Sequence, residues 1–289
     1  MRLAIKFNLI LAFISALCLG VAGVISFKVL EEHSDHEVIE HARMMMESAK
    51  AVRGYTIQEI RPLLQTLGDE EFLPQTVPSY AATQNFKTVQ KDNPEYSYKE
   101  AVLNPTNPRD KATDWENDII TQFRNHSDLK EIIGERETPT GTSLYLARPI
   151  RITNKDCLTC HSTVDQAPAS MIKLYGPANG FGWQHNEIVG SQIISVPAWV
   201  AKEKAWRAFT TFMITLTAIF FVFAIAINLM IRSMITSKIS KMIELADQVS
   251  KGDTNAPDFD LSGNDEMAEL SHSFQRLRIS LSKAMKMLE

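Results

Sequence analysis

Two cysteines and a histidine form the most chemically specific pattern in this sequence. Cys157 and Cys160 are separated by two residues, and His161 follows directly. This C-x-x-C-H spacing is the attachment motif of c-type haem. Two thiolates so spaced can add across the two vinyl groups on one porphyrin edge, and the next residue then places an imidazole beneath the iron. The motif predicts one covalent haem c, with His161 as the proximal iron ligand.

Other chemistries are open to a C-x-x-C pair. A thiol redox motif sits at the start of a helix after a strand in a βαβ setting, which the sequence around Cys157 does not show. A zinc site usually needs a second Cys/His pair at short spacing, and none is present. A disulfide across two residues is strained. The sequence therefore favours haem attachment over these three alternatives.

Four further residues are candidates for holding the haem. Arg53 and Arg148 are candidate partners of the haem propionates, because buried carboxylates need charged partners. Phe181 and Trp183 follow a Gly-rich turn, which predicts aromatic rings packed against the macrocycle. Ordinary roles stay open for all four, as surface ion pairs for the arginines and as core packing for the aromatic residues.

Two uncharged apolar blocks flank the motif. No charged residue occurs between Phe7 and Phe27 or between Ala208 and Ile231, and each block can cross a hydrocarbon core of about 30 Å as a helix. The first block is longer than the roughly 7 to 15 apolar residues of a cleaved signal peptide. The sequence therefore predicts transmembrane helices over 7–27 and 208–231.

Flanking charges and the motif together predict the orientation. Arg2 and Lys6 favour a cytoplasmic N-terminus over residues 1–6, although the basic residues before the second block oppose those after it. Attachment of haem c occurs outside the cytoplasmic membrane, which supports the same orientation. We expect a two-pass protein of the bacterial inner membrane, with residues 28–207 outside and residues 232–289 in the cytoplasm.

The overall charge excludes one class of partner. The 30 Lys and Arg residues stand against 34 Asp and Glu residues, which gives a net charge of −4. No basic patch of the kind that backbone phosphates require is visible, so we expect no nucleic-acid partner. No Ser/His/Asp set or pair of carboxylates stands out, so we expect no enzyme activity.

The predicted external segment mixes helices and strands. Apolar residues at helical spacing predict helices over 29–67, 79–90 and 114–124. Residues 143–152 alternate between apolar and polar, and residues 188–197 are rich in β-branched side chains, so both predict strands. The fold class is therefore α+β, in a folded segment that membrane helices hold at both ends.

Beyond Ile231 the apolar residues follow the spacing of paired helices. Two runs alternate three- and four-residue steps: Ile239, Met242, Ala246 and Val249, then Leu270, Phe274, Leu277, Leu281, Ala284 and Leu288. Two such helices lack a complete core in one chain, so the pattern predicts a parallel homodimer. Gly252-Asp253 ends the first run, Pro257 and Gly263 follow in the connector, and Asp265-Glu266-Met267 opens the second. The block 232–289 thereby resembles a HAMP signal-relay domain.

Several short motifs surround the cysteines. They are Tyr145-Leu-Ala-Arg148-Pro149-Ile150, Cys157 to Ser162, Ala167-Pro168, Tyr175-Gly176, Gly180 to Trp183 and Ser195 to Pro197, with Val52 to Thr56, Val77 to Tyr80 and Asn104 to Asp110 upstream. Together they resemble a family of single-haem, extracytoplasmic sensor domains with a PAS-like core. The resemblance implies a small sheet flanked by helices, with the haem near the sheet and the long N-terminal helix.

The sixth coordination position of the iron has several candidate ligands. The resemblance implies a distal cysteine in some members, but Cys18 lies inside the first apolar block and cannot reach the haem. The remaining candidates are Met44, Met45, Met46, Tyr55, Tyr80, His126 and His185, and an empty or water-filled position is the other alternative. A vacant iron can bind a diatomic gas, whereas a Met or His ligand suits redox sensing or electron transfer.

These patterns lead to one functional expectation and two alternatives. We expect a homodimeric, membrane-anchored haem c sensor that detects redox state or a small ligand outside the membrane. The HAMP helices would relay the change to a separate cytoplasmic partner, such as a kinase or a chemoreceptor-type protein. The alternatives are a membrane-tethered electron-transfer cytochrome c and a thiol oxidoreductase without haem.

Overall fold

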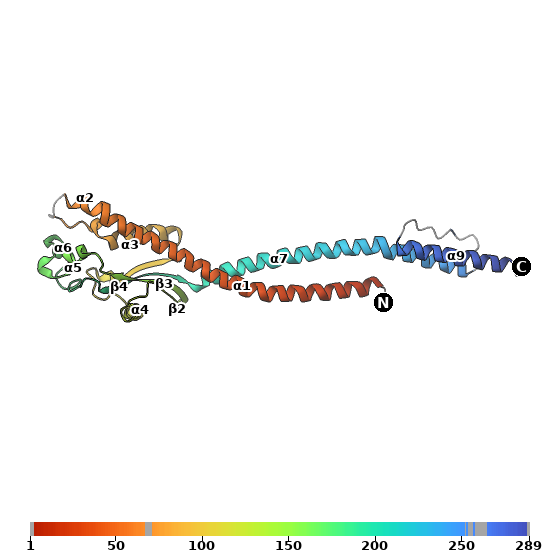
Figure 1. Cartoon of the computed structure of the whole chain (residues 1–289), viewed down its shortest axis with the longest axis horizontal. Helices are drawn as coiled ribbons and strands as arrows, with labels where there is room; N and C mark the ends of the chain where they lie inside the picture. The colour runs from red at the N-terminus through yellow and green to blue at the C-terminus, as the bar shows by residue number, and fades with distance from the viewer. Residues whose placement is uncertain (1–2, 67–70, 252, 254–256, 258–264, 288–289) are drawn as a thin grey trace. The chain divides into compact units, whose positions relative to one another are not determined.

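The chain divides into two compact units, one of residues 27–208 and one of residues 1–26 with 209–289. The structure, a computed structural model, describes residues 3–66, 71–251, 253, 257 and 265–287 (Figure 1). The helices are α1 (Leu3–Tyr55), α2 (Arg61–Gln65), α3 (Pro78–Asp92), α4 (Asp114–Asn125), α5 (Leu158–His161), α6 (Ala169–Tyr175), α7 (Ala198–Ile231), α8 (Ser237–Ser250) and α9 (Glu266–Lys286). The strands are β1 (Ser97–Val102), β2 (Ile132–Thr138), β3 (Gly141–Arg151) and β4 (Ile188–Pro197).

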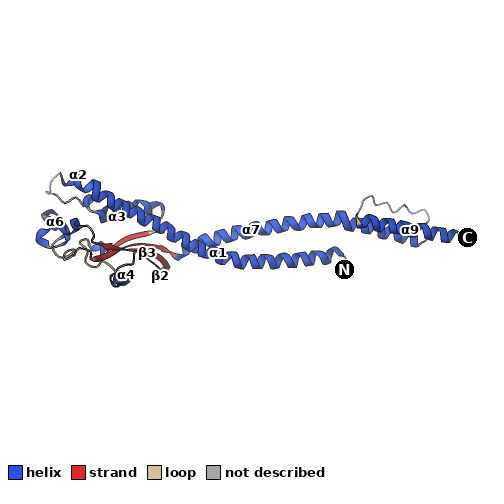
Figure 2. Cartoon of the chain, in the orientation of Figure 1, coloured by secondary structure: helices blue, strands red, loops and turns tan. Residues whose placement is uncertain are grey.

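The strands form one antiparallel sheet in the order β1-β4-β3-β2 (Figure 2). Strand β4 is central and almost wholly buried, so its sequence is a β-branched run without alternation. Strand β2 lies at an edge and alternates between half-buried and exposed positions. The strands predicted over 143–152 and 188–197 are confirmed as β3 and β4, whereas β1 and β2 are additional.

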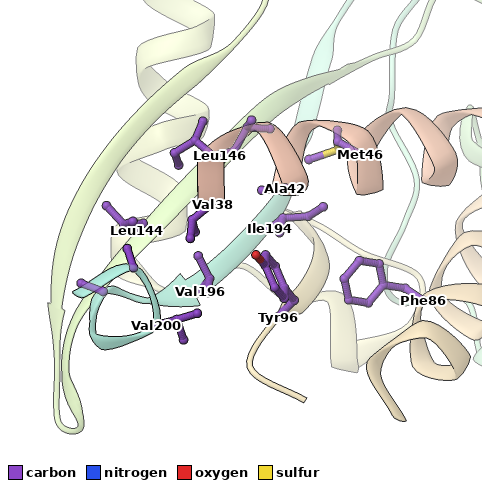
Figure 3. Packing of buried hydrophobic residues seen from close by; sticks show 13 residues of the cluster. Val38, Ala42, Met46, Phe86, Tyr96, Leu144, Leu146, Ile194, Val196 and Val200 are labelled. Carbon is purple, nitrogen blue, oxygen red and sulfur yellow. The ribbon is translucent and has the colours of Figure 1, made fainter. Parts of the chain in front are cut away.

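Helices cover both faces of the sheet. On one face α1 and α3 pack against β3 and β4 through a core that includes Val38, Ala42, Met46, Phe86, Leu144, Leu146, Ile194 and Val196 (Figure 3). The strand residues in this core are two apart, as side chains on one face of a strand must be. On the opposite face α4 packs Ile120 and Phe123 against Ala147 and Ile193.

The predicted helix over 29–67 is confirmed as far as Gln65, with one irregularity near its end, and Leu67 lies outside the described residues. A π-helical turn over Thr56–Ile60 separates α1 from α2. Pro62 has no backbone N–H to donate, and its ring crowds the carbonyl four residues earlier, so regular α-helical bonding cannot continue into α2. Arg53, Ile57 and Arg61 all line one cavity along this part of the helix.

Two described helices are long and apolar enough to cross a membrane, and they contain the predicted blocks 7–27 and 208–231. Their apolar side chains lie on the surface, and Phe13 and Ile214 are each 70% exposed. A continuous apolar surface of this kind suits lipid hydrocarbon better than water. Both helices are therefore candidate membrane spans.

The two helices after the second block pack against each other. Met242 and Leu245 of α8 form a small core with Met267 and Phe274 of α9. Asp265 caps α9, because its Oδ1 accepts a hydrogen bond from the backbone N–H of the third helical residue at 2.9 Å. The helix start predicted from the Asp-Glu-Met sequence is thereby confirmed.

Part of the predicted helical seam is not covered within one chain. Leu270, Leu277 and Leu281 are 43%, 64% and 41% exposed. Gly252, Gly263 and Leu288 from the same prediction lie outside the described residues. The exposed leucines are the surface on which the prediction of a homodimer rests.

Candidate functional site

A cavity of about 170 Å³ lies in the unit of residues 27–208. Its wall includes the π turn and α2, the start of α3, the ends of β1 and β3, and helices α5 and α6. Much of the wall is apolar, with Ile57, Val77, Val102, Ile150, Ile152 and Met171. Cys157, Cys160 and His161 also line it, so all three motif residues face one space.

The motif lies on a turn and a short helix that bring its reactive groups together. The side chain of Asn154 accepts a backbone N–H hydrogen bond at 2.9 Å and caps the 3-10 turn over Lys155–Cys157. Helix α5 follows directly, and residues three and four apart on a helix share one face. Cys160 and His161 therefore lie on the same face as Cys157. Neither cysteine is in a disulfide, and both are half-buried.

His161 is held in the tautomer that a metal ligand needs. Its Nδ1 lies 2.7 Å from the carbonyl oxygen of Gly180, and Nδ1 carries the proton because a carbonyl oxygen can only accept. Nε2 therefore keeps its lone pair. Burial lowers the pKa of His161, so the ring is neutral at neutral pH. The Trp183 ring stacks on the imidazole, with centroids 3.9 Å apart and planes at 15°.

Glycines shape the segment that carries the Gly180 carbonyl. Gly180 and Gly182 have φ angles of +88° and +81°, which glycine adopts without strain. The backbone N–H of Gly182 donates to the Ser162 oxygen at 2.8 Å, and that of Trp183 donates to the His161 oxygen at 3.1 Å. The segment is therefore held against the motif helix by its backbone.

A buried ion pair forms part of the cavity wall. Arg53 of α1 pairs with Glu100 of β1, whose side chain is only 3% exposed. The other carboxylate oxygen of Glu100 accepts a hydrogen bond from the Tyr98 hydroxyl at 2.7 Å. The Tyr98 oxygen in turn accepts one from the Gln192 amide at 2.8 Å. Burial and the charge of Glu100 raise the pKa of Tyr98, so its phenol stays protonated.

Positive charge lies close to the first thiol. Burial raises the pKa of Cys157, and the charges of Arg61 and Arg53 act in the opposite direction. Arg61 lines the cavity, and it makes no ion pair within the described part of the chain. Arg61 is thus a cation available to a negatively charged group in the cavity.

A second polar cluster lies around Tyr175 at the end of α6. Burial raises the pKa of Tyr175, Arg109 lowers it, and Tyr80 and Asp110 raise it, so these side chains are electrostatic neighbours. All four line the cavity, and Arg109 pairs with Asp110 at 3.0 Å. The cavity therefore has an arginine, a carboxylate and two phenols in its wall in addition to the motif.

The structure brings some of the other predicted site residues to the cavity and leaves others outside it. Arg53, Tyr80 and Trp183 line it, whereas Phe181 does not. Of the weaker candidates for the sixth ligand, Tyr55 is 59% exposed, and Met45 packs against the core between α1 and the sheet. Further candidates that do not line the cavity are Met44, Met46, His126 and His185.

Arg148, a candidate partner of a haem propionate, makes ion pairs outside the cavity. Its guanidinium lies 2.5 Å from Glu47 and 2.9 Å from Glu131, and Glu131 also pairs with Arg43 of α1 at 2.7 Å. Arg148 does not line the cavity. These carboxylates accept hydrogen bonds from its guanidinium, so Arg148 ties β3 to α1.

Several cavity residues carry no predicted role. Arg109 and Tyr175 belong to the motifs Asn104 to Asp110 and Tyr175-Gly176, so the sequence marked both residues without indicating what they do. Arg61 and Met171 give no such signal. An arginine at a helix end and a methionine on a short amphipathic helix look ordinary until the chain is folded.

The residues present fit a covalent haem better than the other chemistries of a C-x-x-C pair. Two cysteines outside any disulfide, an imidazole nitrogen with its lone pair, apolar walls and an available arginine match the needs of a porphyrin with two propionates. The hydroxyl oxygen of Thr106, also in the wall, is buried and has no hydrogen-bond partner among the residues that the structure describes. Within the described residues, no cluster of three His, Cys, Asp or Glu side chains suits a metal ion, and no parallel strands form a βαβ unit.

Comparisons with known proteins identify two regions of the chain. The model of the Tll0287-like family matches residues 31–197, and that of the HAMP domain matches residues 230–283. Among solved structures, the crystal structure of the cyanobacterial heme-protein Tll0287 is similar at 17% identity and a TM-score of 0.45, over 56% of this chain and 95% of that chain. No curated protein matches this sequence.

Proposed function

Because this chain belongs to the Tll0287-like family and carries a HAMP domain, we propose that it is a membrane-anchored haem c sensor. Cys157 and Cys160 attach one haem, and His161 is its proximal ligand. The observation that carries this proposal is that Cys157, Cys160 and His161, whose Nε2 keeps its lone pair, all line one cavity. The family takes its name from a protein described as a cyanobacterial heme-protein, which agrees with this cofactor.

The order of the elements supports a signalling role. Two candidate membrane helices flank the cavity-bearing unit, and the HAMP domain follows the second of them. We place the cavity-bearing unit, with a PAS-like core, outside the bacterial inner membrane, since haem c is attached there. We place the HAMP helices in the cytoplasm as a homodimer that signals to a kinase or a chemoreceptor-type partner.

A bound haem would supply an iron whose charge or ligand changes with redox state or with a small molecule. Side chains in and near the cavity wall would respond to that change. Arg53 lies in the cavity wall and pairs with Glu100, and the hydrogen bonds of Glu100 continue through Tyr98 to Gln192. Gln192 lies in β4, which continues into α7 without a connecting loop.

A change at the Arg53–Glu100 ion pair would affect both candidate membrane helices. Arg53 lies on α1, which contains the first candidate span, and β4 leads directly into the second. The mechanism is a population shift, in which the state of the cavity favours one of two packings of these helices. The HAMP helices then transmit that preference to the cytoplasmic partner.

The test asks whether a change in the redox state of the haem alters the packing of the HAMP helices in the full chain. We would produce the protein with the cytochrome c maturation system, place it in lipid nanodiscs and measure distances between gadolinium(III) spin labels on α8 and α9, which dithionite does not reduce, before and after reduction of the haem with dithionite. We expect the distances to change on reduction, and Cys157→Ala/Cys160→Ala to abolish the change. A haem that is reduced while the labels do not respond would overturn the proposal and favour an electron-transfer cytochrome.

Carbon monoxide and nitric oxide distinguish the two kinds of stimulus. A reduced haem that binds either gas and changes the label distances identifies a ligand sensor with an open sixth position. A low-spin haem that binds neither gas identifies a redox sensor with a sixth ligand from the protein. Tyr80 and Met171 then become the first residues to substitute, because both line the cavity.

A further inference from the structure

The loop between β1 and α4 is closed at its base and forms part of the cavity wall. The Lys111 ammonium donates to the Leu103 oxygen at 2.5 Å, and the Ala112 N–H donates to the Val102 oxygen at 3.0 Å. These bonds fix the ends of the Asn-Pro-Thr-Asn-Pro segment that begins at Asn104. A loop held in this way can position whatever its side chains bind.

Asn104 binds the backbone on both sides of one peptide unit. Its Oδ1 accepts a hydrogen bond from the Gly180 N–H at 3.3 Å, and its amide nitrogen donates to the Phe181 oxygen at 3.4 Å. The carbonyl between these two groups is that of Gly180, which accepts the Nδ1 proton of His161. Asn104 does not line the cavity, so it can influence a bound group only through the Gly180 carbonyl and the His161 ring.

The approach of the two loops requires a glycine at position 180. A Cβ atom there would overlap both the backbone and the side chain of Thr106, and the φ angle of +88° is unfavourable for other residues. The Gly180 carbonyl is therefore fixed by its backbone conformation, by contact with Thr106 and by both ends of the Asn104 amide. Little freedom is left for it to turn away from His161.

We propose that Asn104 is a positioning residue for the iron ligand His161. It orients the Gly180 carbonyl, which fixes the imidazole ring and makes Nε2 a stronger donor through the Nδ1 hydrogen bond. Such outer partners of a ligating histidine typically change metal affinity or activity 10- to 100-fold. This inference rests on the proposed function, since it requires a haem at His161.

The expected effect is a change in the balance between ferric and ferrous haem. A weaker Nδ1 hydrogen bond makes Nε2 a poorer donor, which destabilises ferric iron more than ferrous iron. We expect Asn104→Ala to shift the equilibrium at least 10-fold toward the ferrous form, which for one electron is a rise of about 59 mV. The ferric electron paramagnetic resonance spectrum, which reports the axial ligand field, should change as well.

The experiment measures the potential and the ferric spectrum of the full chain in nanodiscs. Asn104→Ser is a second variant that keeps a polar group in the loop but is too short to bridge Gly180 and Phe181. Asn93→Ala is the matched control, because within the described part of the chain the Asn93 side chain bonds only at the end of α3, at 3.1 Å from the Val89 oxygen. We expect both Asn104 variants to shift the two readouts and the Asn93 variant to leave them unchanged.

Three results would overturn the inference or its premise. Wild-type potential and spectrum in both Asn104 variants would exclude a positioning role. Loss of attached haem from both variants, with haem retained by Asn93→Ala, would also exclude it, because a positioning residue tunes the ligand without being required for attachment. Absence of attached haem from the wild-type protein would refute the proposed function itself.

Discussion

Glu100 is the most consequential charged side chain outside the motif. It is 3% exposed, and its two carboxylate oxygens are committed to Arg53 and Tyr98. Glu100→Gln would leave the Arg53 cation without its partner, and breaking a buried pair typically costs about 3 to 5 kcal/mol. Because Arg53 is 24% exposed, we expect about 3 kcal/mol, measured as the free energy of opening from hydrogen exchange of the sheet amides.

The control for this substitution is a pair of the same kind nearer the surface. Glu187 pairs with Arg124 at 2.9 Å, with side chains 34% and 40% exposed. We expect Glu187→Gln to cost about 1 kcal/mol or less. Equal losses in the two variants would show that the Arg53–Glu100 pair has no special role in holding the cavity wall.

For individual residues, the sequence predicts roles that depend on neighbouring positions and misses roles that depend on partners far away in sequence. Cys157, Cys160 and His161 are recognised because their spacing alone specifies the chemistry. The ion pair of Arg148 could not be predicted, because its partner Glu47 lies on another element, far away in sequence. Asn104 goes unnoticed as an individual residue, since its role depends on a backbone that only the folded chain brings to it.

The contact between α1 and the sheet depends on a shared carboxylate. Burial would raise the pKa of Glu131, but the hydrogen bonds from Arg43 and Arg148 outweigh burial and lower it. The stability from this lowered pKa is fully present above the ordinary glutamate value of about 4.3 and is lost as pH falls through the folded value. We therefore expect the protection factors of the α1 amides near Arg43, which correct for the intrinsic pH dependence of exchange, to fall below about pH 4.

Substitution of one arginine checks the origin of this pH dependence. Arg148→Met removes a donor to both Glu131 and Glu47, so we expect faster exchange near Arg43 at neutral pH and a weaker response to acid. Arg124→Met, which removes an exposed pair instead, should keep the wild-type profile. A wild-type profile in Arg148→Met would mean that other groups cause the acid effect.

Most of the elements could be predicted, and the exceptions have physical causes. Strand β4 and the helices carry apolar patterns that persist without context. Strand β1, Ser97–Val102, contains Lys99 and Glu100, and its buried positions become possible only because Arg53 neutralises Glu100. The π turn depends on Pro62, whose effect on the preceding residues is seen only in the folded helix.

For the whole molecule, association and cofactor binding should be separable. Leu277 is 64% exposed on α9, where the seam pattern predicts a partner chain. We expect Leu277→Asp to abolish self-association of the full chain in detergent, measured by analytical ultracentrifugation, and to leave the haem spectrum unchanged. Ser282→Asp, on the same helix outside the seam, should leave both unchanged. A dimer that survives Leu277→Asp would contradict the seam.

The order of membrane helices and domains along the chain can be predicted largely from its apolar pattern. Apolar blocks predict the candidate membrane helices, and helical spacing predicts the HAMP region that the family model matches over residues 230–283. The direction of the chain across the membrane and the homodimer stay predictions, because both depend on surroundings outside one chain.

The proposed function depends on covalent attachment of a haem to Cys157 and Cys160. We would produce the full chain with the cytochrome c maturation system, denature it, extract it with acidified solvent and record the pyridine haemochrome spectrum of the protein fraction. We expect one haem per chain in the wild type and in Cys18→Ala, and none in Cys157→Ala/Cys160→Ala. A wild-type chain that loses its haem on extraction, or a double variant that keeps it, would show that these cysteines do not attach the haem.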